Sequence, residues 1–300
     1  MRPQWWNAGL RTLDDVRAKA KLSTSQSVAL SYYEDILTRI PRDEVAAIEA
    51  VVQQNATELL QGAFVKCCGS FRRGKPDCGD CDMLVTHRDP DPKVQEKLSD
   101  FLKPLLDRLH SSGFLVGDLS VPSGRSAHSH ALYMGLCMLP KGHPQFSGIA
   151  RRIDIKVDLP VLMLHVSSNN SGLCFFFVLQ VYPAPHFAFA LLYFTGSDHF
   201  NRSMRWFANR KGFTLSDHGL SPAVRVAGAG RIWTGPSIYC RTERDIFKAL
   251  GLEFIPPQGR NCYKNIQLPL TVGGVPEPAG AVDCVSNLCD DPASDRNNDP

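Results

Sequence analysis

The sequence lacks the features that mark membrane, secreted and strongly basic proteins. No run of about 20 apolar residues exists to span a bilayer, because polar residues interrupt the longest apolar stretch between Ser167 and Gly172. No secretory signal follows Met1, and no strong basic run is present. The formal net charge is only +3. We therefore expect no membrane partner, and the mild basicity permits nucleic-acid binding without proving it.

The chain also lacks a disulfide framework, although it contains ten cysteines. Its 300 residues, 43% of them hydrophobic and 21% charged, suit one large domain or two to three subdomains. A chain of this length is too long for a small disulfide-stapled scaffold and shows no secretory signal, so we expect the cysteines to be reduced thiols. Cys78 and Cys81 are spaced like half of a zinc site, but no second pair follows at the usual spacing. Zinc is therefore the weaker interpretation of these two residues.

What is present is a short stretch with phosphate-binding chemistry. Gly69 and Ser70 follow the apolar run at 63–65, and Arg73 comes three residues later. Glycine permits close backbone approach, serine offers a hydroxyl and an N–H, and arginine offers a forked donor for phosphate oxygens.

A pair of carboxylates comes next. Asp80 and Asp82 stand two apart at the start of a second apolar run, so on a strand they point to the same face. Adjacent carboxylates repel each other unless a cation lies between them, and oxygen-only ligands suit a hard cation, Mg²⁺ above all. Together with the Gly-Ser turn, this pair is typical of metal-assisted nucleotidyl transfer.

A third acidic position lies in the alternating segment 151–157, which predicts a strand with Asp154 on one face. A carboxylate from a neighbouring strand would complete a site for two metal ions, which clamp the attacking and leaving oxygens of an in-line displacement. The alternative is a surface aspartate on an edge strand, and the pair at Asp80 and Asp82 makes it the weaker one.

Apolar spacing predicts helices in several pieces over 1–39, then over 42–52, 93–110 and 187–193. A later helix carries Asn201 and Arg205 four residues apart on one face, which is suited to contacting a nucleic-acid strand.

Four motifs resemble those of the family X DNA polymerases, with the lambda type nearest. They are Arg-Ile-Pro-Arg-Asp-Glu at 39–44, Cys-Gly-Ser-Phe-Arg-Arg-Gly at 68–74 with Gly-Asp-Cys-Asp at 79–82, Arg-Arg-Ile-Asp-Ile at 151–155, and Tyr-Phe-Thr-Gly-Ser at 193–197 with Phe-Asn-Arg at 200–202. The similarity covers about residues 5–157 and 181–260.

The resemblance implies an α+β fold. We expect a nucleotidyltransferase palm, a mixed β-sheet with flanking helices, over 39–190. A helical remnant of the DNA-binding fingers would precede it at 1–38, and a thumb-like subdomain of helices and a small sheet would follow at 191–260. The tail at 261–300 has no family counterpart, and its composition predicts disorder.

The resemblance also implies a role for each motif residue. Asp80 and Asp82 would hold both metal ions, Mg²⁺ or alternatively Mn²⁺, and Asp154 would hold the catalytic ion and face the primer 3′-hydroxyl. The contacts to the incoming triphosphate would come from Arg39, Ser70, Arg73 and Gly79. The sugar and the nascent base pair would be contacted by Tyr193, Phe194, Gly196 and Asn201, and the DNA by Arg202 and Arg205.

The implied function is a template-directed polymerase of short-gap DNA repair. Its partners would be gapped or primed DNA and dNTPs, its state a monomer, and its location the nucleus. The family's lyase and BRCT domains have no counterpart here, so we predict no lyase activity for this chain. One alternative is a catalytically impaired isoform that only binds DNA or nucleotide. Another is a template-independent nucleotidyltransferase, against which the Tyr193-Phe194 pair argues.

Residues 157–180 have no counterpart in the family. Removing these 24 residues shortens the step from Asp154 to Tyr193 from 39 to 15, which restores the family spacing. A Val codon begins with GT, a Gln codon can be CAG, and the Phe-rich run before Gln180 can encode a pyrimidine tract. We therefore hypothesise a retained intron of 72 nucleotides (24 × 3), with a genuine surface insertion as the alternative.

Overall fold

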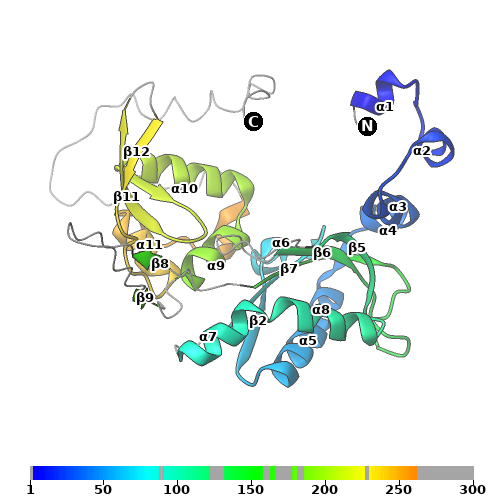
Figure 1. Cartoon of the computed structure of the whole chain (residues 1–300), viewed down its shortest axis with the longest axis horizontal. Helices are drawn as coiled ribbons and strands as arrows, with labels where there is room; N and C mark the ends of the chain where they lie inside the picture. Colours follow the sequence, from blue (N-terminus) through cyan, green and yellow to red (C-terminus); the bar gives the residue numbers. More distant parts are fainter. Residues whose placement is uncertain are drawn as a thin grey trace, which may run out of the picture. The chain divides into compact units, whose positions relative to one another are not determined.

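The fold is described from a computed structural model of the chain (Figure 1). The structure describes residues 3–87, 89, 91–121, 132–157, 163–165, 178–180, 186–226 and 230–261. The chain forms two units, Met1–Gln267 and Leu268–Pro300, and every described residue belongs to the first.

The unit begins with four short helices, and both helices and strands follow along the rest of it. The helices are α1 (Pro3–Asn7), α2 (Leu13–Lys19), α3 (Thr24–Ser31), α4 (Tyr33–Leu37), α5 (Arg42–Leu59), α6 (Gly69–Arg72), α7 (Pro92–Ser99), α8 (Leu102–Ser111), α9 (Phe187–Thr195), α10 (Asp198–Arg210), α11 (Glu243–Ala249) and the 3-10 helix η1 (Pro257–Asn261). The strands are β1 (Ile40–Pro41), β2 (Ala63–Cys67), β3 (Asp77–Cys78), β4 (Cys81–His87), β5 (Leu115–Ser120), β6 (Leu132–Cys137), β7 (Arg151–Val157), β8 (Met163–His165), β9 (Val178–Gln180), β10 (Phe213–Leu215), β11 (Leu220–Val226) and β12 (Gly230–Thr234).

A five-stranded mixed sheet, in the order β2-β4-β7-β6-β5, forms the centre of the palm region. The pairing of β4 with β7 is parallel and the other pairings are antiparallel. The helices α5 and α8 cover one face of this sheet, as Figure 1 shows. The predicted α+β fold with a mixed palm sheet is confirmed.

Strand alternation separates the hydrophobic core from the functional face. On β4, Cys81 and Met83 point into the core beneath α5 and α8, so Asp82 between them points to the opposite face. On β7, Ile153 and Ile155 enter the same core, which leaves Asp154 on the face of Asp82. Burial of the apolar residues thus fixes where both carboxylates lie.

The single helix predicted over 93–110 is wrong, because α7 and α8 are separate helices. Pro104 explains the break. In a continuous helix its ring would clash with the carbonyl of residue 100, whereas in the first turn of α8 a proline is tolerated. The break also turns Phe101 into the core, where it is 4% exposed.

The N-terminal helices are short, and two of them begin with capping boxes at Thr12 and Ser23. A buried ion pair joins α5 to the palm sheet, with Arg151 Nη2 2.7 Å from Glu44 Oε2. Asp35 of α4 accepts a hydrogen bond of 3.0 Å from the N–H of Ala150, beside β7. The first contact connects α5, and the second connects the N-terminal helices, to β7, the strand that carries Asp154.

The thumb region has its own core, in which α9, α10 and α11 pack with the sheet β10-β11-β12. Within 157–180 the structure describes Val157 and a pairing of β8 with β9, and the rest of that segment lies outside the described residues. So does the tail from 262 onward, which leaves the retained-intron and disorder predictions untested. In the part of the chain that is described, no helix is long and apolar enough to cross a membrane.

Candidate active site

Three aspartates meet at one face of the palm sheet. The parallel register pairs Asp82 of β4 with Asp154 of β7, and Asp80 lies in the bend just before β4. One carboxylate oxygen of each lies within 4.8 Å of the other two. The structure therefore brings together all three residues that the sequence singled out as metal ligands.

The electrostatics of this group favour a bound cation. Burial, then the charges of Asp80 and Asp154, raises the pKa of Asp82 to about 7. Burial also raises the pKa of Asp154, against the lowering effect of Arg152. Three carboxylates held this close are costly without a compensating positive charge.

One atom of the group has no protein partner. Asp154 Oδ1 is buried and is one of two such side-chain atoms among the described residues. Its other oxygen, Oδ2, accepts a hydrogen bond of 3.0 Å from Arg152 Nη2. A buried unpartnered oxygen beside two further carboxylates, with oxygen donors only, fits a hard cation such as Mg²⁺ or Mn²⁺.

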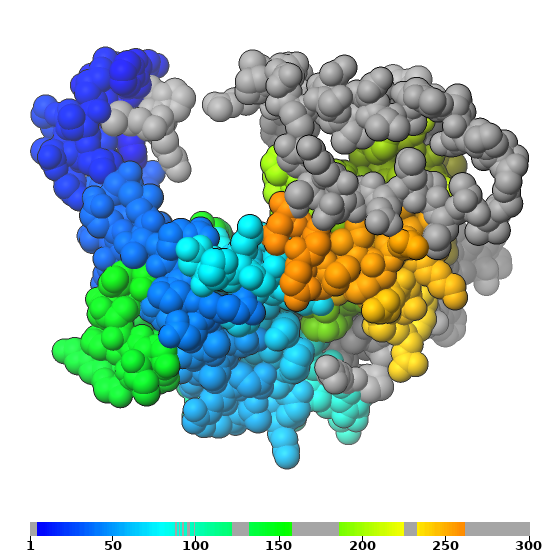
Figure 2. Space-filling view, turned by 180° about the vertical axis from the view of Figure 1, so that it is seen from behind, coloured from blue at the N-terminus to red at the C-terminus, as the bar shows by residue number. Residues whose placement is uncertain are grey.

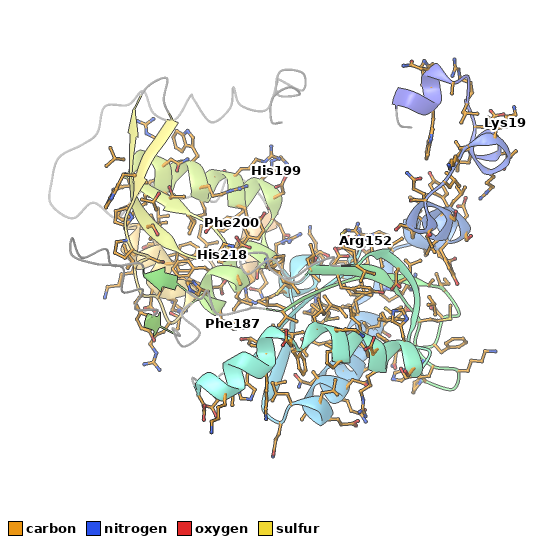
Figure 3. All side chains as sticks on the ribbon, viewed as in Figure 1. Lys19, Arg152, Phe187, His199, Phe200 and His218 are labelled. Carbon is orange, nitrogen blue, oxygen red and sulfur yellow. The ribbon has the colours of Figure 1, made fainter. Side chains whose placement is uncertain are left out.

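Arg152 was not predicted as a site residue. Its Nη2 lies 3.5 Å from Asp80 Oδ2 as well as 3.0 Å from Asp154 Oδ2, so it partly neutralises the group. Figure 3 marks the position of Arg152 on the palm. The sequence could have identified Arg152, because it lies two residues from Asp154 on the same strand and therefore points to the same face.

Position 69 requires a glycine, because the backbone there passes too close to Asp82 to leave room for a side chain. The φ of Gly69 is +50°, and a Cβ placed there would lie 2.0 Å from Asp82 Oδ2. The next residue back, Cys68, donates its N–H to the carbonyl of Asp82 at 2.7 Å. The close backbone approach expected from the Gly-Ser motif is thus an approach to the carboxylate site itself.

A cleft of about 720 Å³ lies beside the aspartates. This volume falls in the range typical of small-molecule sites. The cleft is lined by every residue that we predicted to contact nucleotide, namely Arg39, Ser70, Arg73, Gly79, Tyr193, Phe194, Gly196 and Asn201. The palm and thumb regions both contribute to it.

An ion pair orients Arg39 in the cleft. Asp77 accepts hydrogen bonds from Arg39 Nε at 3.0 Å and from Nη2 at 2.7 Å. The third nitrogen, Nη1, lies 3.2 Å from the position that a Cβ on Gly79 would take. One edge of the guanidinium is therefore held by Asp77, and the remaining nitrogen is directed at Gly79. Asp77 was not predicted as a site residue.

The other arginine of the cleft, Arg73, contacts the thumb region. Its Nη1 donates to the carbonyl of Thr195 at 2.5 Å, and its Nε donates to Asn261 Oδ1 at 2.9 Å. Both contacts leave the guanidinium beside Gly196, where a Cβ would lie 3.3 Å from Arg73 Nη1. Arg73 therefore reaches the cleft at the point where the two regions meet.

Asn201 links α10 to the end of α9, because its Nδ2 donates to the carbonyl of Tyr193 at 2.7 Å. The rings of Tyr193 and Phe194 meet edge to face, with centroids 5.3 Å apart. Arg205 lines a smaller hollow beside Tyr193. Arg202 lies on the exposed side of α10, paired with Asp198, and does not line the cleft.

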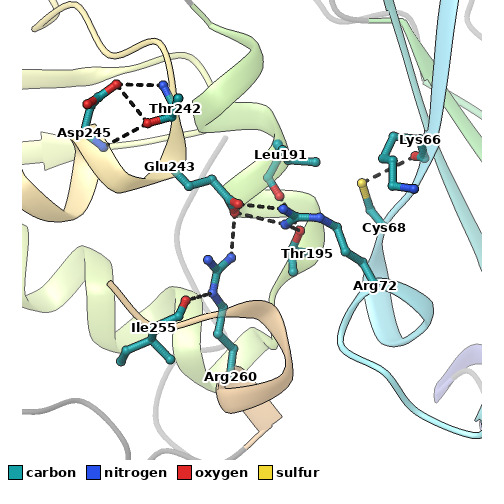
Figure 4. A network of polar contacts seen from close by, with 10 residues as sticks. All are labelled: Lys66, Cys68, Arg72, Leu191, Thr195, Thr242, Glu243, Asp245, Ile255 and Arg260. Atoms are coloured by element: carbon teal, nitrogen blue, oxygen red, sulfur yellow. Dashed lines mark hydrogen bonds and ion pairs between the residues drawn. The ribbon is translucent and has the colours of Figure 1, made fainter. Parts of the chain in front are cut away.

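A buried charge network joins the turn after β2 to α11 and η1 (Figure 4). Glu243 accepts hydrogen bonds from Arg72 at 3.0 and 2.6 Å and from Arg260 at 2.7 Å. Burial would raise the pKa of Glu243, but the hydrogen bonds and charges of the two arginines outweigh it and lower the pKa. In the view from behind, the turn (cyan) and the 255–261 segment (orange) lie side by side (Figure 2).

Comparison with known protein families agrees with this geometry. Three domain profiles match the chain in order: the fingers domain of DNA polymerase lambda at 3–37, the DNA polymerase beta palm at 39–159 and the DNA polymerase beta thumb at 190–261. The chain belongs to the family X DNA polymerases. The three aspartates therefore lie in a family X palm, and Asn201 lies in a family X thumb.

Several characterised relatives extend the match. The chain is 39% identical to rat DNA polymerase lambda over 258 residues, which is 86% of this chain and 39% of the rat protein. It is 35% identical to DNA polymerase lambda of Arabidopsis thaliana, over 85% of this chain and 43% of that protein. It is 30% identical to human DNA-directed DNA/RNA polymerase mu, over 86% of this chain and 49% of that protein. The chain thus spans less than half the length of each relative.

Proposed function

We propose that this chain is a template-directed DNA polymerase that fills short gaps during DNA repair. The observation that carries the proposal is the carboxylate group of Asp80, Asp82 and Asp154, with its buried unpartnered oxygen, beside a cleft of nucleotide size. The names of the relatives, two DNA polymerases lambda and one polymerase mu, support a polymerase acting on DNA.

The chemistry would join a dNTP to a primer. The 3′-oxygen of the primer would attack the α-phosphorus as its proton passes to solvent water. The bond from the α-phosphorus to the oxygen that bridges it to the β-phosphate would break, and pyrophosphate would leave. Mg²⁺ or Mn²⁺, when bound, supplies charge stabilisation for the oxygens around phosphorus. The three aspartates would hold it, and Asp154 would also face the primer 3′-hydroxyl.

The remaining cleft residues would position the substrates. The triphosphate would be bound by Arg39, Ser70, Arg73 and the backbone of Gly79. The aromatic pair Tyr193–Phe194 and Gly196 would pack under the sugar, and Asn201 would contact the nascent base pair. Arg202 and Arg205 would bind DNA outside the cleft. We further propose subdomains at 1–38, 39–190 and 191–260, and a nuclear location on family grounds alone.

Single-nucleotide insertion into gapped DNA tests this function. The full chain, a chain without residues 157–180 and the variant Asp154→Asn are compared with Mg²⁺ and each dNTP. We expect insertion directed by the template base, and none from Asp154→Asn. Insertion that ignores the template base would instead support a template-independent transferase. If neither the full chain nor the chain without residues 157–180 inserted a nucleotide, the polymerase proposal would be overturned.

A catalytically impaired form is the second candidate, because β7 ends at Val157, three residues after Asp154. An insertion there can displace the carboxylate, and a misplacement of about 1 Å can cost on the order of 10²-fold in rate. Insertion by the shortened chain alone would select this candidate. Equal insertion by both chains would exclude it.

A further inference from the structure

The helix α10 has an exposed face that the cleft does not use. Arg202, Trp206 and Arg210 follow one another at intervals of four residues, and all three are exposed. The opposite side of the helix, with Phe200, is buried in the thumb core, as is visible in Figure 3. The aromatic residue on the exposed face is 41% exposed.

Trp206 is oriented by its arginine neighbour. The guanidinium carbon of Arg210 lies 5.1 Å from the centre of the indole ring, a distance at which cation–π attraction holds the two together. Although it makes this contact, Trp206 remains exposed, so part of its side chain is open to solvent. A tryptophan already held in place loses little conformational entropy when a ligand stacks on it.

The charge of the helix indicates what this face would bind. Within Asp198–Arg210 there are three arginines and one aspartate, a net charge of +2 (3 − 1, His neutral). Lys211 follows directly. Phosphates bind such arginines, and bases stack on aromatic rings with little sequence preference.

The face continues from the candidate active site. Asn201 lines the cleft, and Arg205 lines the hollow beside Tyr193. Arg202 on the exposed face pairs at 2.8 Å with Asp198, which also lines the cleft. A duplex end held at the cleft would therefore place the strand that continues beyond it along this face.

We propose that Trp206, flanked by Arg202 and Arg210, stacks an unpaired base of the single strand that extends beyond a primer–template duplex. The proposal rests on the proposed function in one respect, namely that a DNA end occupies the cleft. The surface itself is assigned from exposure, ring geometry and charge.

Equilibrium binding without nucleotide or metal tests the proposal. Labelled duplexes are compared with and without a single-stranded template overhang, using the full chain, Trp206→Ala and Trp206→Phe. Trp233→Ala is the matched control, since Trp233 is an exposed tryptophan of the thumb sheet, 53% exposed.

We expect Trp206→Ala to weaken binding of the overhang duplex about fivefold or more, since one stacked base is worth about 1–3 kcal/mol. Binding of the blunt duplex should stay within about twofold, Trp206→Phe should retain most of the overhang preference, and Trp233→Ala should change neither affinity. These expectations do not depend on catalysis.

Unchanged overhang binding in Trp206→Ala would overturn the proposal, and so would equal losses on both duplexes, which would indicate altered helix packing. If wild type inserts no nucleotide but the overhang preference depends on Trp206, the stacking surface stands and the polymerase proposal fails. If wild type inserts normally and the preference does not depend on Trp206, only the stacking proposal fails.

Discussion

The affinity of the aspartate group for a divalent cation should fall steeply as the pH drops from 8 to 6. The cause is Asp82, whose pKa is raised to about 7 by burial and by the charges of Asp80 and Asp154. A cation binds the carboxylate form, so each ion that enters below pH 7 must displace a proton.

The size of the effect follows from that pKa. With a pKa of about 7, roughly nine-tenths of Asp82 side chains are ionised at pH 8 and roughly one-tenth at pH 6, so apparent affinity drops about tenfold. The same linkage acts on stability without metal. The folded state holds the proton of Asp82 more tightly than the unfolded chain does. The contribution of Asp82 to the stability of the fold is therefore largest below pH about 4, and this contribution is lost as the pH rises through about 7. A bound cation offsets that loss of stability.

Calorimetric titration of the metal-free full chain with Mn²⁺ at pH 6, 7 and 8 measures the affinity, and buffers of different ionisation enthalpy measure the released protons. Asp82→Asn should remove most of the affinity and its pH dependence. Asp43→Asn, an exposed carboxylate in the first turn of α5, should change neither. Equal affinities at pH 6 and 8 for the wild type would refute the reasoning.

Three further substitutions test other contacts. Glu243→Ala leaves the buried Arg260 and the half-buried Arg72 without a carboxylate, so it should lower the free energy of unfolding by about 3–5 kcal/mol in urea denaturation. A change under about 1 kcal/mol would show that the network is not stabilising. Asp77→Ala frees Arg39, so it should raise the KM for dNTP severalfold with kcat little changed. Asp77→Asn keeps an oxygen that accepts from Arg39, so its KM should stay near the wild-type value. A lower KM in the alanine variant would mean that Asp77 opposes nucleotide binding. Gly69→Ala places a methyl group against the Asp82 carboxylate and should abolish Mn²⁺ binding, and retained binding in calorimetry would contradict the close contact.

The carboxylate site was largely predictable because a strand has a period of two. That period placed Asp82 and Asp154 opposite the apolar residues of their own strands, and packing of those residues beneath α5 enforces the arrangement. Asp80 was predicted on the same strand as Asp82, but it lies in the bend just before β4, so the strand period does not explain its position. The family resemblance implied that the sheet is mixed, and the strand order was not predicted, since periodicity does not specify which strands pair.

Long-range polar contacts were not predictable in the same way. Glu243 is 171 residues from Arg72 in sequence, and no local pattern pairs them. The contact of Asp77 with Arg39 depends on the pairing of β3 with β1, two strands of two residues each. Such short strands carry almost no periodic signal. The break between α7 and α8, by contrast, follows from a local rule about Pro104 and was available from the sequence.

The three carboxylates differ in how firmly the backbone holds them. Asp82 and Asp154 are ladder partners in adjacent strands, so their backbone separation is set by the strand spacing of about 4.8 Å. Asp80 sits in a bend outside the ladder. When a cation binds this group, a larger ion needs longer bonds to oxygen, and of the three backbones only that of Asp80 could move without breaking the sheet. We expect that lengthening or stiffening the two-residue bend at 79–80 would change which ions fit while the sheet stays as it is.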